Sequence, residues 1–169
     1  MAPPPTTPTP VGTNFTVVNA NSVVSLANGG LESPQLSLIP ESGPVLVAGS
    51  VVANNHSGPV PVPGMGGPQT TIASGTRVCT YIVNWDPVTK SQGSAIAAVI
   101  DFGQPILGIT PTGIGALASQ FDLPGVVYGD ANHSLLFTND FLRSDGTVLE
   151  INIRVANGAM DQFRVITSC

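Results

Sequence analysis

Charge is scarce in this 169-residue sequence, and the deficit is concentrated in its first 76 residues. Those residues contain two charged side chains, Glu32 and Glu41, whereas the remaining 93 residues contain thirteen. Charge depletion with abundant proline and glycine is typical of low-complexity segments. The same stretch is nevertheless rich in Val, Leu and Ile, which a solvated linker does not need. We therefore expect extended β-structure that is covered, either by this chain or by copies of it.

Basic side chains are also few. The chain has five: Arg77, Lys90, Arg143, Arg154 and Arg164. They do not cluster, and nucleic-acid binding requires a patch of Lys and Arg that neutralises phosphates, so we expect no nucleic-acid partner. No run of about 18 apolar residues occurs, so the sequence predicts no membrane span. A surface this poor in charge suits an extracellular or cell-surface protein, or an assembly subunit, better than a cytosolic enzyme.

Cysteine is limited to Cys79 and Cys169. Cys79 lies in an apolar, strand-like run, and Cys169 stands at the C-terminal end of the sequence, where a strand would otherwise fray. A disulfide that fastens the C-terminal strand is the preferred interpretation. The alternatives are two reduced thiols, or a link between chains through Cys169. Two cysteines alone do not make a zinc site.

Proline is concentrated at the N-terminus, at positions 3, 4, 5, 8 and 10. Because proline fixes φ and lacks a backbone N–H, residues 1–13 are predicted to form an extended, Pro-rich arm or linker. Residues 14–169 then form a single domain. The sequence leaves open whether residues 14–70 belong to the same sandwich as the rest.

Short runs of β-forming residues recur along the chain, with turn residues between them roughly every 8–12 positions. This spacing predicts an all-β fold, an antiparallel β-sandwich of jelly-roll type. Helical periodicity occurs only near residues 113–121, where a short helix is expected. The predicted strands are 14–26, 35–39, 45–53, 76–85, 94–102, 105–109, 125–128, 134–138, 148–155 and 162–167.

Several motifs in the second half are similar to those of a known family. They are IASGTRV at 72–78, VNWDPV at 83–88, IDFGQPILGI at 100–109 and DQFRVIT at 161–167. Together they resemble a family of secreted bacterial surface proteins of unknown function. The resemblance implies a secreted β-domain and brings no catalytic residues with it.

Aromatic residues make up only 5% of the chain, and three of them are candidate ligand-binding residues: Tyr81, Trp85 and Tyr128. Tyr81 and Trp85 lie on the same face of one predicted strand, because side chains alternate with a period of two. With Tyr128 they could form a platform for stacking sugar rings. The alternative is that this face belongs to the hydrophobic core.

Oxygen-bearing side chains in the predicted loops are candidate ligands for a structural calcium ion, namely Asp130, Asn132 and Asp140. The alternative is that they cap their own turns. No other cofactor is expected. The chain has no Gly-x-Ser-x-Gly motif, and no spacing selects a pair of catalytic carboxylates.

These patterns predict a non-enzymatic, extracellular structural protein that self-associates, as a homo-oligomer or polymer, into a surface layer, fibre or shell. Uncharged strands leave sheet edges that a neighbouring copy can fill. The alternative function is a β-sandwich module that binds a polysaccharide or another surface ligand, with a possible dependence on calcium.

Overall fold

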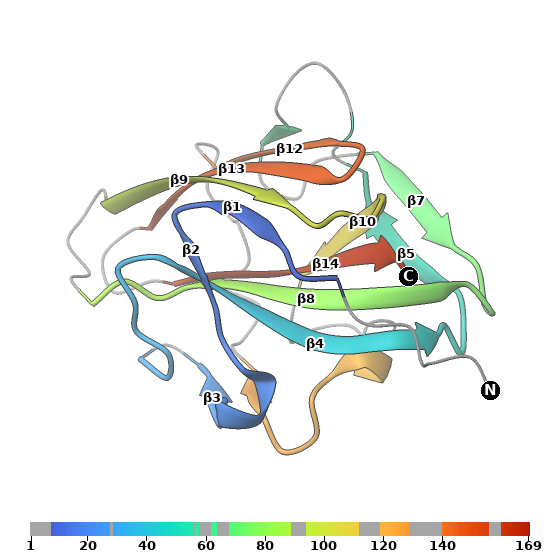
Figure 1. The fold of residues 1–169 in the computed structure, drawn as a ribbon, viewed down its shortest axis with the longest axis horizontal. Coiled ribbons are helices and arrows are strands. Elements are labelled where there is room, and N and C mark those ends of the chain that lie inside the picture. Colours follow the sequence, from blue (N-terminus) through green and yellow to red (C-terminus); the bar gives the residue numbers. More distant parts are fainter. Residues whose placement is uncertain are drawn as a thin grey trace.

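The computed structural model describes residues 8–27, 29–55, 57, 62–63, 68–88, 94–111, 119–128, 140–155 and 160–169. Its strands form two sheets that pack face to face, so the predicted all-β sandwich is confirmed (Figure 1). Most neighbouring strands run antiparallel, and two short pairs run parallel.

The first sheet has five strands in the order β1-β9-β13-β12-β6. Its bounds are β1 Val11–Thr13, β9 Ser94–Asp101, β13 Val148–Val155, β12 Phe141–Asp145 and β6 Val62–Pro63. Strands β9 and β13 pair along eight consecutive positions and form its centre. Three of its five strands come from the second half of the chain.

The second sheet has seven strands in the order β2-β4-β8-β14-β10-β5-β7. Its bounds are β2 Phe15–Val17, β4 Leu36–Leu46, β8 Arg77–Trp85, β14 Asp161–Ser168, β10 Ile106–Pro111, β5 Val51–Asn54 and β7 Gln69–Ile72. Strands β8 and β14 pair along eight positions. The described parts of residues 14–70 supply strands to both sheets, so they belong to the same sandwich as the rest.

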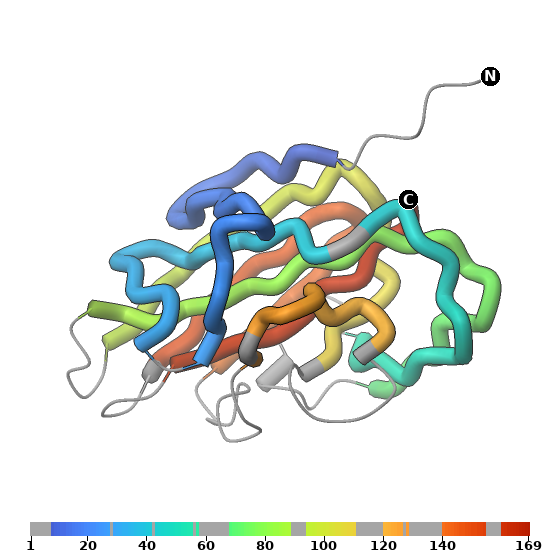
Figure 2. Tube along the Cα trace, turned by 90° about the horizontal axis from the view of Figure 1, so that it is seen from below, coloured from blue at the N-terminus to red at the C-terminus, as the bar shows by residue number. Residues whose placement is uncertain are grey.

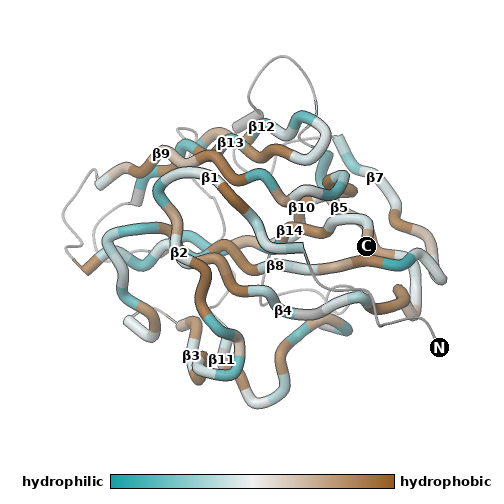
Figure 3. The backbone as a smooth tube through the Cα atoms, viewed as in Figure 1, coloured by the Kyte–Doolittle hydropathy of each residue, from teal (hydrophilic) through white to brown (hydrophobic). Residues whose placement is uncertain are grey.

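The main hydrophobic core lies between the two sheets. It is built from every second side chain of the facing strands, because side chains alternate between the two faces of a strand. On β8, Cys79, Tyr81, Val83 and Trp85 point inward, and the facing sheet contributes alternate residues such as Ile100. Fully burying an aliphatic or aromatic side chain stabilises the fold by about 1.5–3 kcal/mol. Coloured by hydropathy, the strands of both sheets carry many brown, apolar positions (Figure 3).

A third, thinner layer covers the outer face of the seven-stranded sheet. It consists of the segments around residues 18–31 and 119–128, which meet in a two-stranded parallel sheet of β3, Ser25–Leu26, and β11, Val127–Tyr128. Viewed from below, both segments cross in front of the sheet (Figure 2). Apolar residues from this layer pack on Ile39 and Ile82 of the sheet. The outer face is therefore a second buried surface.

Helical structure is limited to single turns among the described residues. They are the 3-10 turns η1, Ala20–Ser22, and η2, Ser119–Phe121. Of the helix predicted near 113–121, only residues 119–121 are described, and they form η2; residues 112–118 lie outside the described residues. Phe121 is buried in a cluster with Ile166 and its neighbours.

The boundary predicted after residue 13 is corrected by the fold. Residues 11–13, assigned to the arm, form β1, an edge strand of the first sheet that pairs with Val99–Asp101 of β9. Pro10 is buried, and Gly12 approaches β9 so closely that a Cβ atom would overlap the Val99 carbonyl oxygen. The chain then crosses to the second sheet at Asn14, whose φ is 58°.

The prediction that Pro40 and Pro44 separate two strands is wrong. Both lie within β4, which runs from Leu36 to Leu46 with two register shifts against β8. Strand β2 pairs only with residues 36–38 of β4, so the prolines stand where β4 has one strand neighbour. A missing N–H is tolerated at such an edge.

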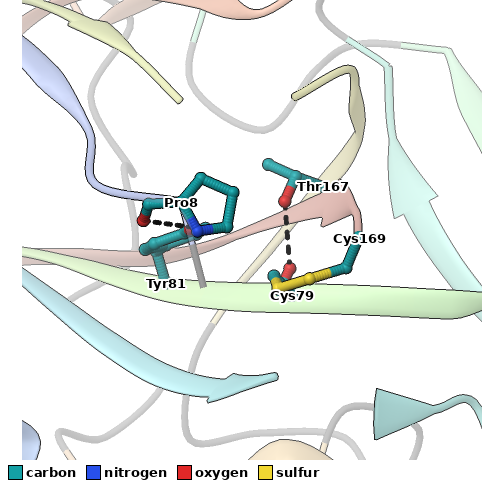
Figure 4. The surroundings of a disulfide bond; sticks show 5 residues. All are labelled: Pro8, Cys79, Tyr81, Thr167 and Cys169. Atoms are coloured by element: carbon teal, nitrogen blue, oxygen red, sulfur yellow. Dashed lines mark hydrogen bonds between the residues drawn. A yellow bond between two sulfur atoms is a disulfide. The ribbon is translucent and has the colours of Figure 1, made fainter. Parts of the chain in front are cut away.

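The two cysteines form a disulfide within one chain, which confirms the preferred interpretation. Cys79 of β8 and Cys169, just after β14, lie 5.4 Å apart between Cα atoms (Figure 4). Gly43 packs directly on this bond, because a Cβ at that position would meet the Cys79 Sγ at 2.5 Å. The bond fastens the end of a central strand.

Candidate functional site

The predicted aromatic platform does not form. Tyr81 is fully buried and Trp85 is 3% exposed, and both belong to the core between the sheets. The ring of Tyr81 lies 4.9 Å from that of Phe102, and its hydroxyl donates a hydrogen bond to the Pro8 carbonyl oxygen at 3.2 Å (Figure 4). A buried ring offers no face to a ligand. Tyr81 and Trp85 therefore belong to the hydrophobic core, as the alternative interpretation stated.

Burial raises the pKa of Tyr81 to about 12. An unfolded tyrosine titrates near pH 10, so between about pH 10 and 12 the unfolded chain releases this proton while the folded chain retains it. Stability should therefore fall as pH rises through this window. Tyr81→Phe should show a smaller fall in unfolding free energy between pH 8 and pH 11, measured by denaturant titration. An identical alkaline fall in both proteins would contradict a neutral, buried Tyr81.

Tyr128, the third predicted ligand-binding residue, belongs to a cluster of charged residues beneath the covering layer. Its hydroxyl donates to Glu41 Oε1 at 2.6 Å and accepts from the Leu123 N–H at 2.8 Å. The Arg164 guanidinium donates to both Glu41 oxygens at 2.5 Å and to Asp122 Oδ1 at 2.6 Å. Glu41 and Arg164 come from β4 and β14, whereas Asp122 and Tyr128 come from the covering segment. The cluster thus fastens the outer layer to the sheet.

The Glu41–Arg164 ion pair at the centre of the cluster is sealed from solvent, whereas Asp122 at its margin is not. The side chains of Arg164 and Glu41 are 1% and 0% exposed, and that of Asp122 is 35% exposed. Burial alone would lower the pKa of Arg164, but hydrogen bonds and charges from Glu41 and Asp122 outweigh it, so this pKa is raised. Burial, followed by the charge of Glu41, also raises the pKa of Tyr128. Every charged group has a partner, and the role of the cluster is structural.

Sequence reasoning did not find this cluster, although the sequence carries a signal for it. Glu41 and Arg164 are single charges in otherwise apolar strand segments, the pattern of a buried ion pair. Their partners could not be identified, because 123 positions separate the two residues.

The predicted calcium site is only partly covered by the described residues. Asp130 and Asn132 lie outside them. Asp140 is fully buried, and its Oδ1 accepts a hydrogen bond from the Arg154 backbone N–H at 2.7 Å. The donor lies on β13, 14 positions along the chain, so through this contact Asp140 binds a neighbouring strand and does not cap its own turn. Within the described ranges, no three His, Cys, Asp or Glu residues are grouped as metal ligands.

The charge-poor part of the sequence also exposes few charged side chains in the fold. Glu41 is buried, which leaves Glu32 as the one exposed charged side chain among the described residues from 8 to 76. We call the exposed side chains of these residues, apart from Glu32, the uncharged surface. It includes five of the seven large hydrophobic side chains that are exposed in the described structure. The five are Val11, Val17, Val24, Leu46 and Val52.

Both edge strands of the seven-stranded sheet belong to the uncharged surface. Strands β2 and β7 end the seven-stranded sheet, and neither Phe15–Val17 nor Gln69–Ile72 contains a charged residue or a proline. Natural proteins commonly protect edges with Lys, Pro or a bulge, because an open edge can pair with another chain. The candidate functional site is therefore this uncharged surface with its two open edges.

Comparison with protein-family models, with curated proteins and with solved structures finds no match for this chain. The resemblance to secreted bacterial surface proteins remains an expectation from the sequence. Among the described residues, no helix is long and apolar enough to cross a membrane.

Proposed function

We propose that this chain is a non-enzymatic structural protein that associates with copies of itself through the uncharged surface. The observation that carries the proposal is the nearly complete absence of exposed charge over the described residues from 8 to 76, together with exposed aliphatic side chains. Copies that meet through this surface bury apolar area and desolvate few charges. A surface layer, a fibre or a shell would result.

The open edges supply a geometry for assembly. Strand β7 pairs with β5 on one side, and its other side ends the sheet. Strand β2 has the same position at the opposite end. Because β7 and β2 are different edges, pairing β7 of one copy with β2 of the next is a head-to-tail contact. Repeated contacts of this kind produce rings or open filaments. Main-chain hydrogen bonds would then add to apolar burial.

The disulfide supports an oxidising compartment. Disulfides persist in secreted and cell-surface proteins and are rare in the cytosol. We therefore place the assembly outside the cell or at the cell surface, where a stable, charge-poor β-sandwich is a suitable structural unit.

Charge insertion at the two edges tests the proposal. Val17 on β2 and Thr71 on β7 are exposed, so Val17→Lys and Thr71→Lys should leave the fold intact and place a charge at each edge. Light scattering after size exclusion, over a series of protein concentrations, should show the native chain as a multiple of its own mass. Each variant should shift toward the single chain.

Val88→Lys is the matched control. Val88 is 61% exposed and lies outside the uncharged surface, so the same substitution there should leave the mass distribution unchanged. A native chain that stays monomeric at every concentration would refute self-association. Equal effects of all three lysines would show that added net charge, and not the location at an edge, controls the mass.

A further inference from the structure

A groove crosses the outer face of the five-stranded sheet, on the opposite side of the sandwich from the charged cluster. Its volume is about 680 Å³, within the range of roughly 300–1,000 Å³ that is usual for ligand sites. Strand register aligns its residues in two rows across the sheet. One row contains Ala97, Asn152 and Phe141, and the next contains Thr13, Val99, Glu150 and Arg143.

The groove combines an apolar floor with polar groups at its margins. Ala97 and Val99 form a floor of small side chains, and Phe141 lines the groove at the far strand. The exposed amide of Asn152 makes no hydrogen bond with any other described residue. Asn14 marks the near end, where its Nδ2 donates to the Ala97 carbonyl oxygen at 2.7 Å. This side chain is held in place where the chain leaves the sheet.

The charges in the groove cancel. Arg143 Nε donates to Glu150 Oε2 at 3.0 Å, and Arg143 Nη2 also contacts Glu150 Oε1. The hydrogen bond from Arg143 holds the pKa of Glu150 below its usual range, so the pair remains ionised and balanced at neutral pH. Among the residues that the structure describes, no other charged one lines the groove. A charged ligand would find no complementary net charge in the groove. An uncharged ligand with polar edges could accept hydrogen bonds from Arg143 and donate them to Glu150.

The backbone pairing and the polar side chains of the groove disfavour the binding of an extended peptide or a lipid. The floor lies on β9 and β13, whose backbone groups are engaged along eight positions, and Asn14 occupies the Ala97 carbonyl at the β9 edge. A peptide would therefore find an unpaired edge only on the part of β9 that precedes Val99, where β1 no longer pairs, and not along the groove floor. An acyl chain would bury the amide of Asn152 without a hydrogen bond, which is unfavourable.

We propose that this groove binds an uncharged polysaccharide. A pyranose ring has apolar C–H faces and hydroxyl groups around its edge, which matches a floor of Ala97, Val99 and Phe141 bordered by amides. One sugar ring packs on Phe141, and its hydroxyls bond to Asn152 and to the Arg143–Glu150 pair. This site shares Thr13 and Asn14 with the uncharged surface, but its floor and its far wall lie outside that surface, so a bound glycan would leave β7 and most of the uncharged surface free for assembly.

Calorimetric titration with neutral hexasaccharides tests the proposal. The probes are cellohexaose, xylohexaose and mannohexaose, with hexagalacturonate as the acidic counterpart. At least one neutral probe should bind, with an affinity that is the same in low and high salt because no net charge is involved. Ala97→Leu, which fills the floor, and Phe141→Ala, which removes the ring, should each weaken binding about tenfold or more.

Ala95→Leu is the matched control, because Ala95 is exposed on β9 two residues from Ala97 and outside the groove lining. It should leave the affinity unchanged. The proposal is overturned if no neutral probe binds, if only hexagalacturonate binds, or if Ala97→Leu binds as well as the native chain. Because Ala97→Leu removes no contact, it remains informative even if Phe141→Ala fails to fold. Loss of self-association in Ala97→Leu with no change in glycan binding would assign the groove to a second copy and also overturn the proposal.

Discussion

Breaking the Cys79–Cys169 disulfide is expected to lower the free energy of unfolding by about 4–5 kcal/mol. The two cysteines are 90 positions apart, and a link across so long a loop removes much of the conformational entropy of the unfolded chain. The loss would be a large fraction of the roughly 5–15 kcal/mol that stabilises an ordinary domain. Denaturant unfolding can be followed by the fluorescence of Trp85, the single tryptophan, which is buried in the core.

The comparison needs two forms of the unlinked chain. Cys79→Ala combined with Cys169→Ala removes the bond and also a buried sulfur, whereas reduction of the native chain removes the bond alone. Alanine is preferred to serine at position 79, because Cys79 is fully buried and a hydroxyl there would need a partner. Equal losses in both forms would assign the effect to the link. Unchanged stability on full reduction would refute the prediction.

Arg164→Met is expected to destabilise the fold by about 3–5 kcal/mol. The substitution preserves much of the side-chain volume but leaves Glu41 buried without the guanidinium that binds both of its oxygens. It also releases Asp122, and with it the covering segment that packs on the sheet. Hydrogen exchange should therefore show increased opening of residues 119–128 in the variant.

The double variant Glu41→Met with Arg164→Met separates charge burial from packing. Replacing both partners of a buried ion pair by apolar residues is often nearly neutral, so the double variant should recover most of the lost stability. Arg143→Met is the matched control on the surface. Its partner Glu150 is 46% exposed, and solvent screening makes the loss small. If the double variant is as unstable as Arg164→Met alone, the defect lies in packing and the assignment is wrong.

The local β-structure of the second half was predictable because its signals lie within a few residues of one another. The alternation around Tyr81 and the apolar run of 148–155 predict β8 and β13 closely, and the turn at Asp145-Gly146 separates two paired strands. In contrast, β12 was not predicted. Phe141–Asp145 contains only two large apolar residues and two charges, and it becomes a strand because β13 pairs with it.

The candidate aromatic site could not be decided from the sequence. A period of two places Tyr81 and Trp85 on one face of a strand, but it does not say whether that face meets solvent or another sheet. The groove was missed for a related reason. Its residues come from four strands that span Thr13 to Asn152, and their alignment depends on strand order and register.

The sequence alone determined that this protein is a β-sandwich with a charge-poor first half and one pair of cysteines, because composition, alternation and turn residues are properties of short segments. Only the tertiary structure decided which charges are buried, which edges stay open and which side chains meet. β1 and β2 enter different sheets, Glu41 meets Arg164 across β8, and the groove forms where β1 leaves β9. Each of these results depends on long-range strand pairing, which minimises the exposure of apolar faces over the whole chain and which no short segment encodes.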